Sequence, residues 1–269
     1  MSVASLTVPR LRLSDLARLA SVGLRTRRLR GGLSALGIAI GVAVIVAVLG
    51  LSSSSQAGLL NEISRLGTNL LTVTNGQTLA GGTAELSTAA PRMIGRIGPV
   101  TQVQYIGAVG AADAYRSPLI PSINTNGLSV DASSLNLPRA IGTSVAQGVY
   151  LNAAAAQEPV VVLGVVAAQR LGIDRIWPGE RIWVGNQWFY LAGILKHAVY
   201  APEIDTAVLV GFPAAEKYLA YDGHPSTIYV RAQTSQVGAV QSVLGATASP
   251  EYPNEVDVSQ PSAALVAQA

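Results

Sequence analysis

The sequence contains no cysteine, which excludes a disulfide framework, thiol catalysis and any cysteine-ligated zinc or iron–sulfur centre. Histidine occurs only twice, so a histidine-rich metal site is not expected either. Charged residues make up 12% of the 269 residues, and hydrophobic residues make up 49%. A chain this apolar is not an intrinsically disordered or acidic solvating segment. It is either a folded chain or a membrane chain.

The few charges are unevenly distributed. The first 30 residues hold seven arginines and one acidic residue, a local charge of +6, whereas the whole chain has a net charge of +3. The rest of the chain is therefore mildly acidic, at −3. Because the two parts differ in sign, we expect them to face different surroundings. The basic arm is explained by a membrane flank, and no nucleic-acid partner is expected.

A run of twenty uncharged residues extends from Gly32 to Leu51. At 1.5 Å per residue, a helix of this length matches a hydrocarbon core of about 30 Å, so residues 32–51 are predicted to form a transmembrane helix. A buried core helix is one alternative, but it would be expected to show a polar face, and Ser34 is the only hydroxyl here. A cleaved signal peptide is the second alternative, since residues 55–57 resemble a cleavage site for signal peptidase. The long preceding arm and the length of the run argue against it.

Arginines cluster at the amino-terminal end of this run, at Arg25, Arg27, Arg28 and Arg30. Cytoplasmic flanks of membrane helices carry the excess of Lys and Arg. We therefore expect a single-pass chain in the cell (inner or plasma) membrane, with a cytoplasmic amino terminus and residues 52–269 extracytoplasmic. Within the run, Gly37 and Gly41 form a small-xxx-small pair that would let another helix approach closely.

Residues 1–31 form a cytoplasmic arm. From Leu13 to Arg25, apolar residues recur at helical spacing, and Ser14 suits the N-cap position. This pattern predicts an amphipathic helix at the cytoplasmic membrane face. The alternative is a basic arm that only sets the orientation of the span.

The residues after the span are predicted to form an α+β head in three parts. Residues 52–110 are expected to hold a helical stalk and a first β-α-β unit, and residues 226–269 repeat the order strand, helix, strand. Pairing the two units gives a four-strand α+β lobe, with residues 111–225 inserted as a second, β-rich lobe.

Two segments carry a resemblance to known proteins. The first joins Ala35-Leu-Gly-Ile-Ala-Ile-Gly41 to Ile63-Ser-Arg-Leu-Gly-Thr-Asn-Leu-Leu-Thr-Val73. This segment resembles the first membrane helix and stalk of the macrolide-exporter (MacB-like, FtsX-like) family of ABC transporter permeases. The second runs from Val160-Val-Val-Leu-Gly164 to Ala192-Gly-Ile-Leu195, and it is similar to the core of the family's extracytoplasmic domain.

The resemblance implies that the first and third parts of the head form a porter-like lobe. It also implies a cytoplasmic ABC ATPase subunit, a second permease copy or paralogue, the lipid bilayer and an extracytoplasmic adaptor as partners. Such permeases have four membrane helices, and the three expected after the outer domain are missing here. The chain is therefore expected to be a fragment, the first half of a split gene or a degenerate permease.

The resemblance assigns roles to two groups of residues. The ATPase or membrane-face contact would involve Leu16, Arg18, Arg25, Arg27 and Arg28, and the stalk-to-strand junction would be Leu66, Gly67, Thr68 and Asn69.

No catalytic or cofactor motif is found. The sequence lacks the GxxxxGK[ST] phosphate loop, so ATP hydrolysis is expected on a separate subunit and no cofactor is expected. The segment Gly142-Thr-Ser-Val-Ala146 departs from the G-x-S-x-G elbow at its last position, which disfavours a hydrolase. His197 and His224 are interpreted as loop or core residues rather than a metal pair.

Two further groups leave alternatives open. Glu203 and Asp205 could share one face of an extended segment and bind a cation, although a solvated loop is the favoured interpretation. Bulky aromatic residues concentrate between Trp177 and Tyr190, including Trp183 and Trp188. Packing in a strand core is favoured over contact with a partner or ligand.

The sequence thus predicts a permease subunit, or the N-terminal part of one, of an ABC-type exporter for drugs, peptides or lipid-like substrates. No proline occurs between Leu11 and Ala90, which permits one continuous, rigid helix to transmit motion. The alternative is a single-pass, membrane-anchored extracytoplasmic binding or scaffold protein without transport activity.

Overall fold

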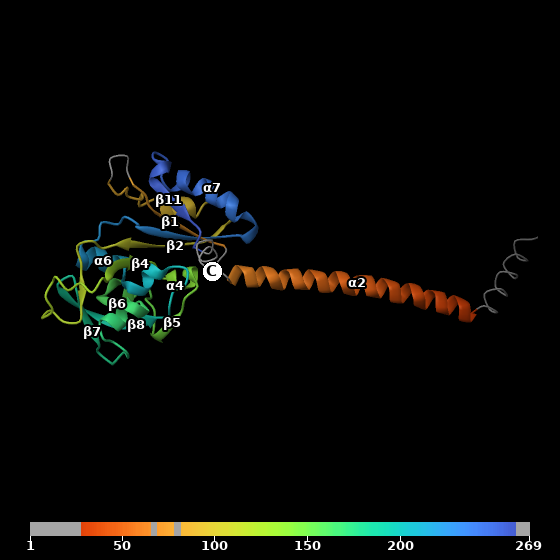
Figure 1. Cartoon of the computed structure of the whole chain (residues 1–269), viewed down its shortest axis with the longest axis horizontal. Helices are drawn as coiled ribbons and strands as arrows, with labels where there is room; N and C mark the ends of the chain where they lie inside the picture. The colour runs from red at the N-terminus through yellow and green to blue at the C-terminus, as the bar shows by residue number, and fades with distance from the viewer. Residues whose placement is uncertain (1–27, 66–68, 78–81, 262–269) are drawn as a thin grey trace, which may run out of the picture. The chain divides into compact units, whose positions relative to one another are not determined.

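The computed structural model describes residues 28–65, 69–77 and 82–261 (Figure 1). The chain divides into two units, Met1–Leu59 and Leu60–Ala269, and each is described by itself below. The predicted amphipathic helix of the cytoplasmic arm lies outside the described residues.

Helix α2 spans Arg28–Arg65 as one unbroken element of 38 residues, about 57 Å at 1.5 Å per residue (Figure 1). Within it, Gly31–Gly50 has a mean hydropathy of 2.6, and none of this stretch is buried. Its aliphatic side chains are largely exposed, for example Leu33 at 68% and Ile38 at 69%. The prediction of an apolar helix here, long enough to cross a membrane, is confirmed.

The head is built on a single mixed sheet of eleven strands among the residues described. The strand order is β11-β1-β10-β2-β4-β9-β6-β8-β7-β3, and β5 pairs with β8 outside this path. The strands are β1 Leu70–Asn75, β2 Val100–Ala108, β3 Ala114–Tyr115, β4 Ser129–Ser133, β5 Val145–Gly148, β6 Val160–Leu163, β7 Arg181–Val184, β8 Gln187–Leu195, β9 Ala207–Gly211, β10 Thr227–Ala232 and β11 Val256–Ser259.

Short helices connect these strands. The α-helices of the head are α3 Ala90–Ile94, α4 Leu137–Ile141, α5 Val165–Arg170, α6 Phe212–Leu219 and α7 Val237–Ala248. The 3-10 helices are η1 Ala155–Gln157, η2 Pro202–Thr206, η3 Thr234–Gln236 and η4 Pro253–Glu255.

The first four strands in the order form the predicted pair of β-α-β units. β1, α3 and β2 make one unit, and β10, α7 and β11 make the other, with every neighbouring pair of strands antiparallel. Alternate residues of β1 point to opposite faces, so Leu71 and Val73 pack beneath α3 and α7, while Leu70 joins a different core. Figure 1 shows α7 lying over β11 and β1. The predicted fold class is confirmed.

The sheet continues from this lobe into the inserted residues. β2 pairs with β4, with Ile106 opposite Ser133, and β4 then pairs with β9 in parallel. Because one sheet crosses the proposed boundary, the limits of the inserted lobe at residues 111 and 225 stay a prediction.

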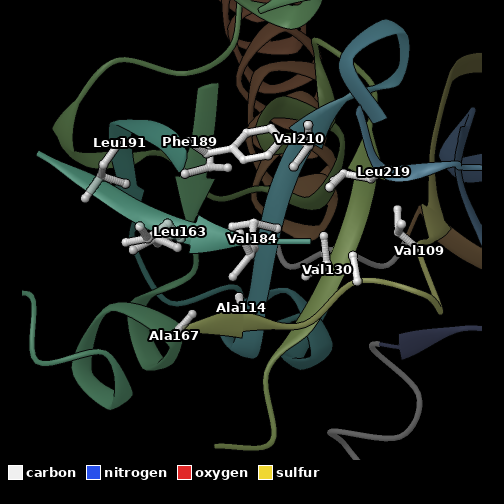
Figure 2. Close-up of a cluster of buried hydrophobic side chains, with 14 of the residues drawn as sticks. Val109, Ala114, Val130, Leu163, Ala167, Val184, Phe189, Leu191, Val210 and Leu219 are labelled. Carbon is white, nitrogen blue, oxygen red and sulfur yellow. The ribbon is translucent and has the colours of Figure 1, made fainter. Parts of the chain in front are cut away.

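The inserted part has an apolar core on each face of its sheet. On β6, Val161 and Leu163 belong to one core and Val162 to the other, which explains why the run after Pro159 is continuously apolar. Figure 2 shows the first of these cores, where Val130, Phe189 and Val210 converge from different strands.

Sequence patterns did not reveal β3, β4, α4 or β5. β4 has the sequence Ser-Val-Asp-Ala-Ser and lacks the β-branched run typical of strands. α4 is only five residues long and is followed by Gly142, whose φ of 74° suits the residue after a helix. Tertiary pairing, and not local propensity, defines these elements.

Candidate functional site

The predicted helix-contact residues Gly37 and Gly41 lie within the exposed part of α2. A methyl group placed on either Cα would meet no atom of the described chain within 4 Å. The absence of a side chain at both positions, one turn apart, leaves backbone open to a neighbouring helix. The contact itself stays a prediction.

Most of the residues assigned to the cytoplasmic contact and to the junction are not described. Leu16, Arg18, Arg25 and Arg27, together with Leu66, Gly67 and Thr68, lie outside the described residues. Arg28 is the first residue of α2, and Asn69 directly precedes β1. Asn69 is thus the junction residue whose contacts can be described.

Asn69 is fixed to β10 by its backbone and by its side chain. Its carbonyl oxygen accepts a hydrogen bond from the backbone N–H of Ala232 at 3.1 Å. Its side-chain Oδ1 accepts a hydrogen bond from Nη1 of Arg231 at 2.7 Å. The start of β1 is therefore held at the point where the chain leaves the junction and enters the sheet.

Arg231 extends this connection to the inserted part of the head. Its Nε donates to the carbonyl oxygen of Ala140 in α4 at 2.6 Å. Burial lowers the pKa of Arg231, and no carboxylate of the described chain forms an ion pair with it. One guanidinium thus joins the start of β1, strand β10 and helix α4. We call Asn69, Arg231 and Ala140 the junction anchor.

The sequence patterns above did not identify Arg231 as a functional residue, although the alternation of residues in β10 could have indicated it. In β10, Ile228 and Val230 point into the core beneath α3 and α7, so strand alternation sends Tyr229 and Arg231 to the opposite face. An arginine on a face shared with a fully buried tyrosine needs acceptors there. The sequence does not tell which acceptors these are, because Asn69 and Ala140 are distant along the chain.

A second link joins β10 to the inserted part through Tyr229. Its hydroxyl donates to Oε1 of Glu203 in η2 at 2.6 Å. Burial, followed by the charge and hydrogen bond of Glu203, raises the pKa of Tyr229 well above its ordinary value. The sheet and η2 are therefore tied by a buried phenol whose proton is held in place.

The hypothesis that Glu203 and Asp205 share one face of an extended segment is wrong, because both residues lie in the 3-10 helix η2. The interpretation as solvated residues holds for Glu203, which is exposed, but not for Asp205, which is only 4% exposed. One Asp205 oxygen accepts the backbone N–H of Ala198 at 2.9 Å, and the other contacts Nδ1 of His197. Both oxygens of Asp205 therefore have partners within the fold, as a buried carboxylate requires.

The two histidines serve separate local contacts. His197 pairs with Asp205, whereas Nδ1 of His224 lies 2.9 Å from the carbonyl oxygen of Leu86. In the part of the chain that the structure describes, no group of three or more His, Asp or Glu residues is arranged to hold a metal ion.

The aromatic segment is divided between core and surface. Phe189 is fully buried, whereas Trp177 is 59% exposed. Trp183 and Trp188 pack edge to face at a centroid distance of 5.3 Å. The interpretation as core packing therefore holds for Phe189 but not for Trp177.

Comparison with known proteins gives consistent matches. Residues 32–246 match the model of the MacB-like periplasmic core domain. The chain is 31% identical over 189 residues to the macrolide export ATP-binding/permease protein MacB of Azoarcus sp., a match that covers 68% of this chain and 28% of that protein. It is 25% identical over 224 residues to the pyoverdine export ATP-binding/permease protein PvdT of Pseudomonas syringae pv. tomato, covering 81% of this chain and 33% of that protein. The chain thus spans about a third or less of either relative.

Solved structures share the fold of the head. The periplasmic region of MacB from Actinobacillus actinomycetemcomitans superposes with a TM-score of 0.56 at 12% identity, covering 77% of this chain and 95% of that one. The extracellular domain of the ABC-type transporter YknZ, from Gram-positive bacteria, gives a TM-score of 0.55 at 12% identity, covering 71% and 100%. At this identity the likeness concerns the fold alone.

Proposed function

The chain belongs to the MacB-like periplasmic core domain family, and from this membership we propose that it is a permease subunit, or the N-terminal part of one, of an ABC-type exporter. In this role it couples a cytoplasmic ATPase to the extracytoplasmic head during efflux of drug, peptide or lipid-like substrates. The named relatives are export proteins, which supports the class of activity.

The observation that carries this proposal is the continuity of α2. The apolar stretch Gly31–Gly50 occupies only part of the helix, which continues without interruption to Arg65. Transmission of motion across a bilayer requires an element that does not bend, and α2 contains no proline. About fifteen residues, or roughly 22 Å of helix, remain on the carboxyl side of the apolar stretch to serve as a stalk.

In the proposed topology the arginine-rich arm is cytoplasmic, α2 crosses the cell membrane, and the head is extracytoplasmic. The arginines before the apolar stretch support this orientation. ATP hydrolysis is assigned to a separate ABC ATPase subunit, since the 269 residues contain no phosphate loop. The relatives' names combine ATP binding and permease in one protein, so a fused ATPase is an alternative arrangement for the same chemistry.

The remaining partners follow from the same proposal. A second permease copy or a paralogue would pack against the Gly37 and Gly41 face of α2, where the backbone is open. The ATPase would contact the arm at Leu16, Arg18, Arg25, Arg27 and Arg28. An extracytoplasmic adaptor is a further partner of the head.

Crosslinking in the native membrane tests the proposed ATPase contact. A photo-crosslinking amino acid replaces Arg18 in the full-length chain, and the captured proteins are identified by mass spectrometry. A matched probe replaces Asp222, an exposed residue of the head. We expect an ABC ATPase to be captured from position 18 and not from position 222.

Two results would contradict the proposal. Capture of the ATPase from position 222 would reverse the orientation. Capture of no ATPase from any arm position, under conditions where the chain is abundant in the membrane, would favour the anchored binding or scaffold protein without transport activity.

A further inference from the structure

The inserted part of the head carries a cleft whose lining residues have no part in the proposed transport role. Its volume is about 380 Å³, within the range of small-molecule sites. It lies between the start of the loop after β3 and the turn that precedes β7. We call it the arginine–tryptophan cleft, and its walls include Arg116, Ser117, Pro178, Glu180, Arg181 and Trp188.

Arg181 presents an unused set of hydrogen-bond donors in this cleft. Its guanidinium carbon lies 4.5 Å from the centroid of the Trp188 ring, and Trp188 is in turn packed against Trp183. This cation–π contact holds the guanidinium over the ring. Within the described residues, the Arg181 side chain makes no ion pair or hydrogen bond. A planar guanidinium with a free edge is suited to bind two oxygens of one carboxylate or phosphate.

A second guanidinium stands beside it. Arg116 forms an ion pair with Glu180, whose side chain is 12% exposed, while the Arg116 side chain remains 42% exposed. This pair neutralises the one carboxylate among the named wall residues, so the cleft retains the positive charge of Arg181. The charge complements an anion.

Three exposed apolar side chains stand close along the chain to residues that line the cleft. Leu119 and Ile123 follow Arg116 in the loop after β3 and are 90% and 88% exposed. Trp177 precedes the wall residue Pro178 and is 59% exposed, with the Arg175 guanidinium 5.6 Å from its ring centroid. Side chains exposed to this degree offer apolar area that the hydrocarbon part of a ligand could cover, with release of ordered water.

We propose that the arginine–tryptophan cleft binds a small amphipathic anion, with a phosphate or carboxylate group carried on an apolar chain. The anionic group binds Arg181, with Arg116 beside it, and the apolar chain lies along Leu119, Ile123 and Trp177. The small volume of the cleft favours one molecule over a segment of an acidic protein. Binding at this site can be measured without transport or the ATPase, because every residue involved belongs to the head.

The tryptophans allow direct measurement. The chain has three tryptophans: Trp188 lines the cleft, Trp183 packs on Trp188, and Trp177 directly precedes the wall residue Pro178, so intrinsic fluorescence reports on the cleft without a label. The full chain in nanodiscs of zwitterionic lipid is titrated with octyl phosphate below its micelle concentration. Octyl glucoside supplies the same chain without the anion, and inorganic phosphate supplies the anion without the chain.

We expect a saturable fluorescence change with octyl phosphate, a much weaker one with inorganic phosphate, and none that saturates with octyl glucoside. Arg181→Gln is expected to raise the half-saturating concentration of octyl phosphate about tenfold or more, because the bidentate charged contact is lost. Arg181→Lys, which keeps the charge without the planar fork, should give an intermediate increase and serves if the Gln variant does not fold.

Two controls separate the parts of the site. The double variant Leu119→Ser and Ile123→Ser should weaken binding of octyl phosphate several-fold and leave the response to inorganic phosphate unchanged. Arg92→Gln removes an exposed arginine from α3 and should have no effect.

The proposal is overturned if Arg181→Gln and Arg181→Lys titrate like the unmodified chain, or if octyl glucoside gives the same saturable response. Capture of an acidic protein segment at this surface, with no response to octyl phosphate, would overturn it in favour of a protein partner.

Discussion

Helix α2 and the head use the same aliphatic residues in opposite ways. On α2, Leu33, Ile38 and Val42 are 68%, 69% and 55% exposed, whereas in the head Leu163 and Ile182 are fully buried. Each large apolar side chain left in water costs about 1.5–3 kcal/mol relative to burial. The head meets this requirement within its own sheet, while α2 requires lipid or another helix. The difference shows that the two regions are built for two solvents.

The largest expected effect comes from placing charge on α2. The double substitution Ile40→Asp and Val44→Asp puts two carboxylates at the centre of the apolar stretch, where each costs about 2.5–3.5 kcal/mol on membrane-insertion scales. We expect the chain to disappear from the carbonate-resistant membrane fraction. Cell fractionation followed by immunoblotting measures this loss.

The matched control places a charge on an equally exposed position of the head. Ala246→Asp lies on the outer face of α7 and should leave the membrane fraction unchanged. Membrane retention of the doubly charged α2 variant would break the comparison, because α2 would then not need a lipid environment.

The next effect, of about 3–5 kcal/mol, is expected in the core of the head. Phe189 is fully buried in the core that Figure 2 shows. Its ring packs edge to face on Tyr218, at a centroid distance of 6.3 Å. Phe189→Ala removes these contacts and leaves a cavity. Urea unfolding followed by tryptophan fluorescence should show the corresponding loss in the free energy of unfolding. Leu36→Ala on α2, where the side chain is 56% exposed, should leave this transition unchanged.

The division into helix α2 and the head was predictable, because α2 begins in a long uncharged run whereas the head shows the patterns of short strands and helices. A charge-free run of twenty residues indicates a membrane helix or a buried helix. The strands β6, β7 and β10 are indicated by β-branched and aromatic residues between residues that favour turns. β4 was not predictable. Aspartate is disfavoured in strands, and Asp131 lies at the centre of this one. The strand forms because β2 and β9 pair with it on both sides.

The junction anchor was half predictable, for a related physical reason. Asn69 stood in a segment that resembles a known junction, but its partner Arg231 lies 162 residues away. A hydrogen bond across such a separation depends on strand order and register, here Leu70 opposite Arg231. Local patterns carry neither, so the partner emerges only from the fold. The same holds for Glu203 and Tyr229.

A buried charge sharpens the comparison further, with an expected effect of about 3 kcal/mol at most. Asp131 is 6% exposed, and its Oδ2 accepts a hydrogen bond from the Ser129 hydroxyl at 2.7 Å. Burial, opposed by the Ser129 bond and aided by the charge of Glu203, raises the pKa of Asp131 to about 6 from 3.8. The folded head therefore binds a proton more readily than the unfolded chain.

The sign of the pH effect follows from this difference. The contribution of Asp131 to stability is fully present below about pH 4 and is lost as pH rises through about 6, by about 3 kcal/mol. Asp131→Asn should remove this part of the pH dependence, so its stability relative to the unmodified chain should increase between pH 4 and pH 7. Urea unfolding at both pH values measures the change. Ser129→Ala, which removes the opposing hydrogen bond, should enlarge the dependence, and an unchanged difference between the Asn variant and the unmodified chain would contradict the account.

The smallest effect is expected at the junction anchor, where the sequence leaves α2 and enters the sheet. Arg231→Met keeps the length of the side chain but leaves Oδ1 of Asn69 and the Ala140 carbonyl without their donor, at a cost of about 1.5–3 kcal/mol. Release of the half-buried charge offsets part of this loss, because the guanidinium itself is costly to bury.

The free energy of global unfolding therefore does not isolate the role of the anchor. Local opening of individual strands, measured by hydrogen exchange, does. Hydrogen exchange should accelerate at the β1 residues next to Asn69, while β9, which pairs with β4 and β6 and not with β1 or β10, keeps its protection. Arg92→Met, an exposed change on α3, should alter neither strand. Equal acceleration in β1 and β9 would mean that Arg231 supports the whole sheet rather than the point where the stalk joins it.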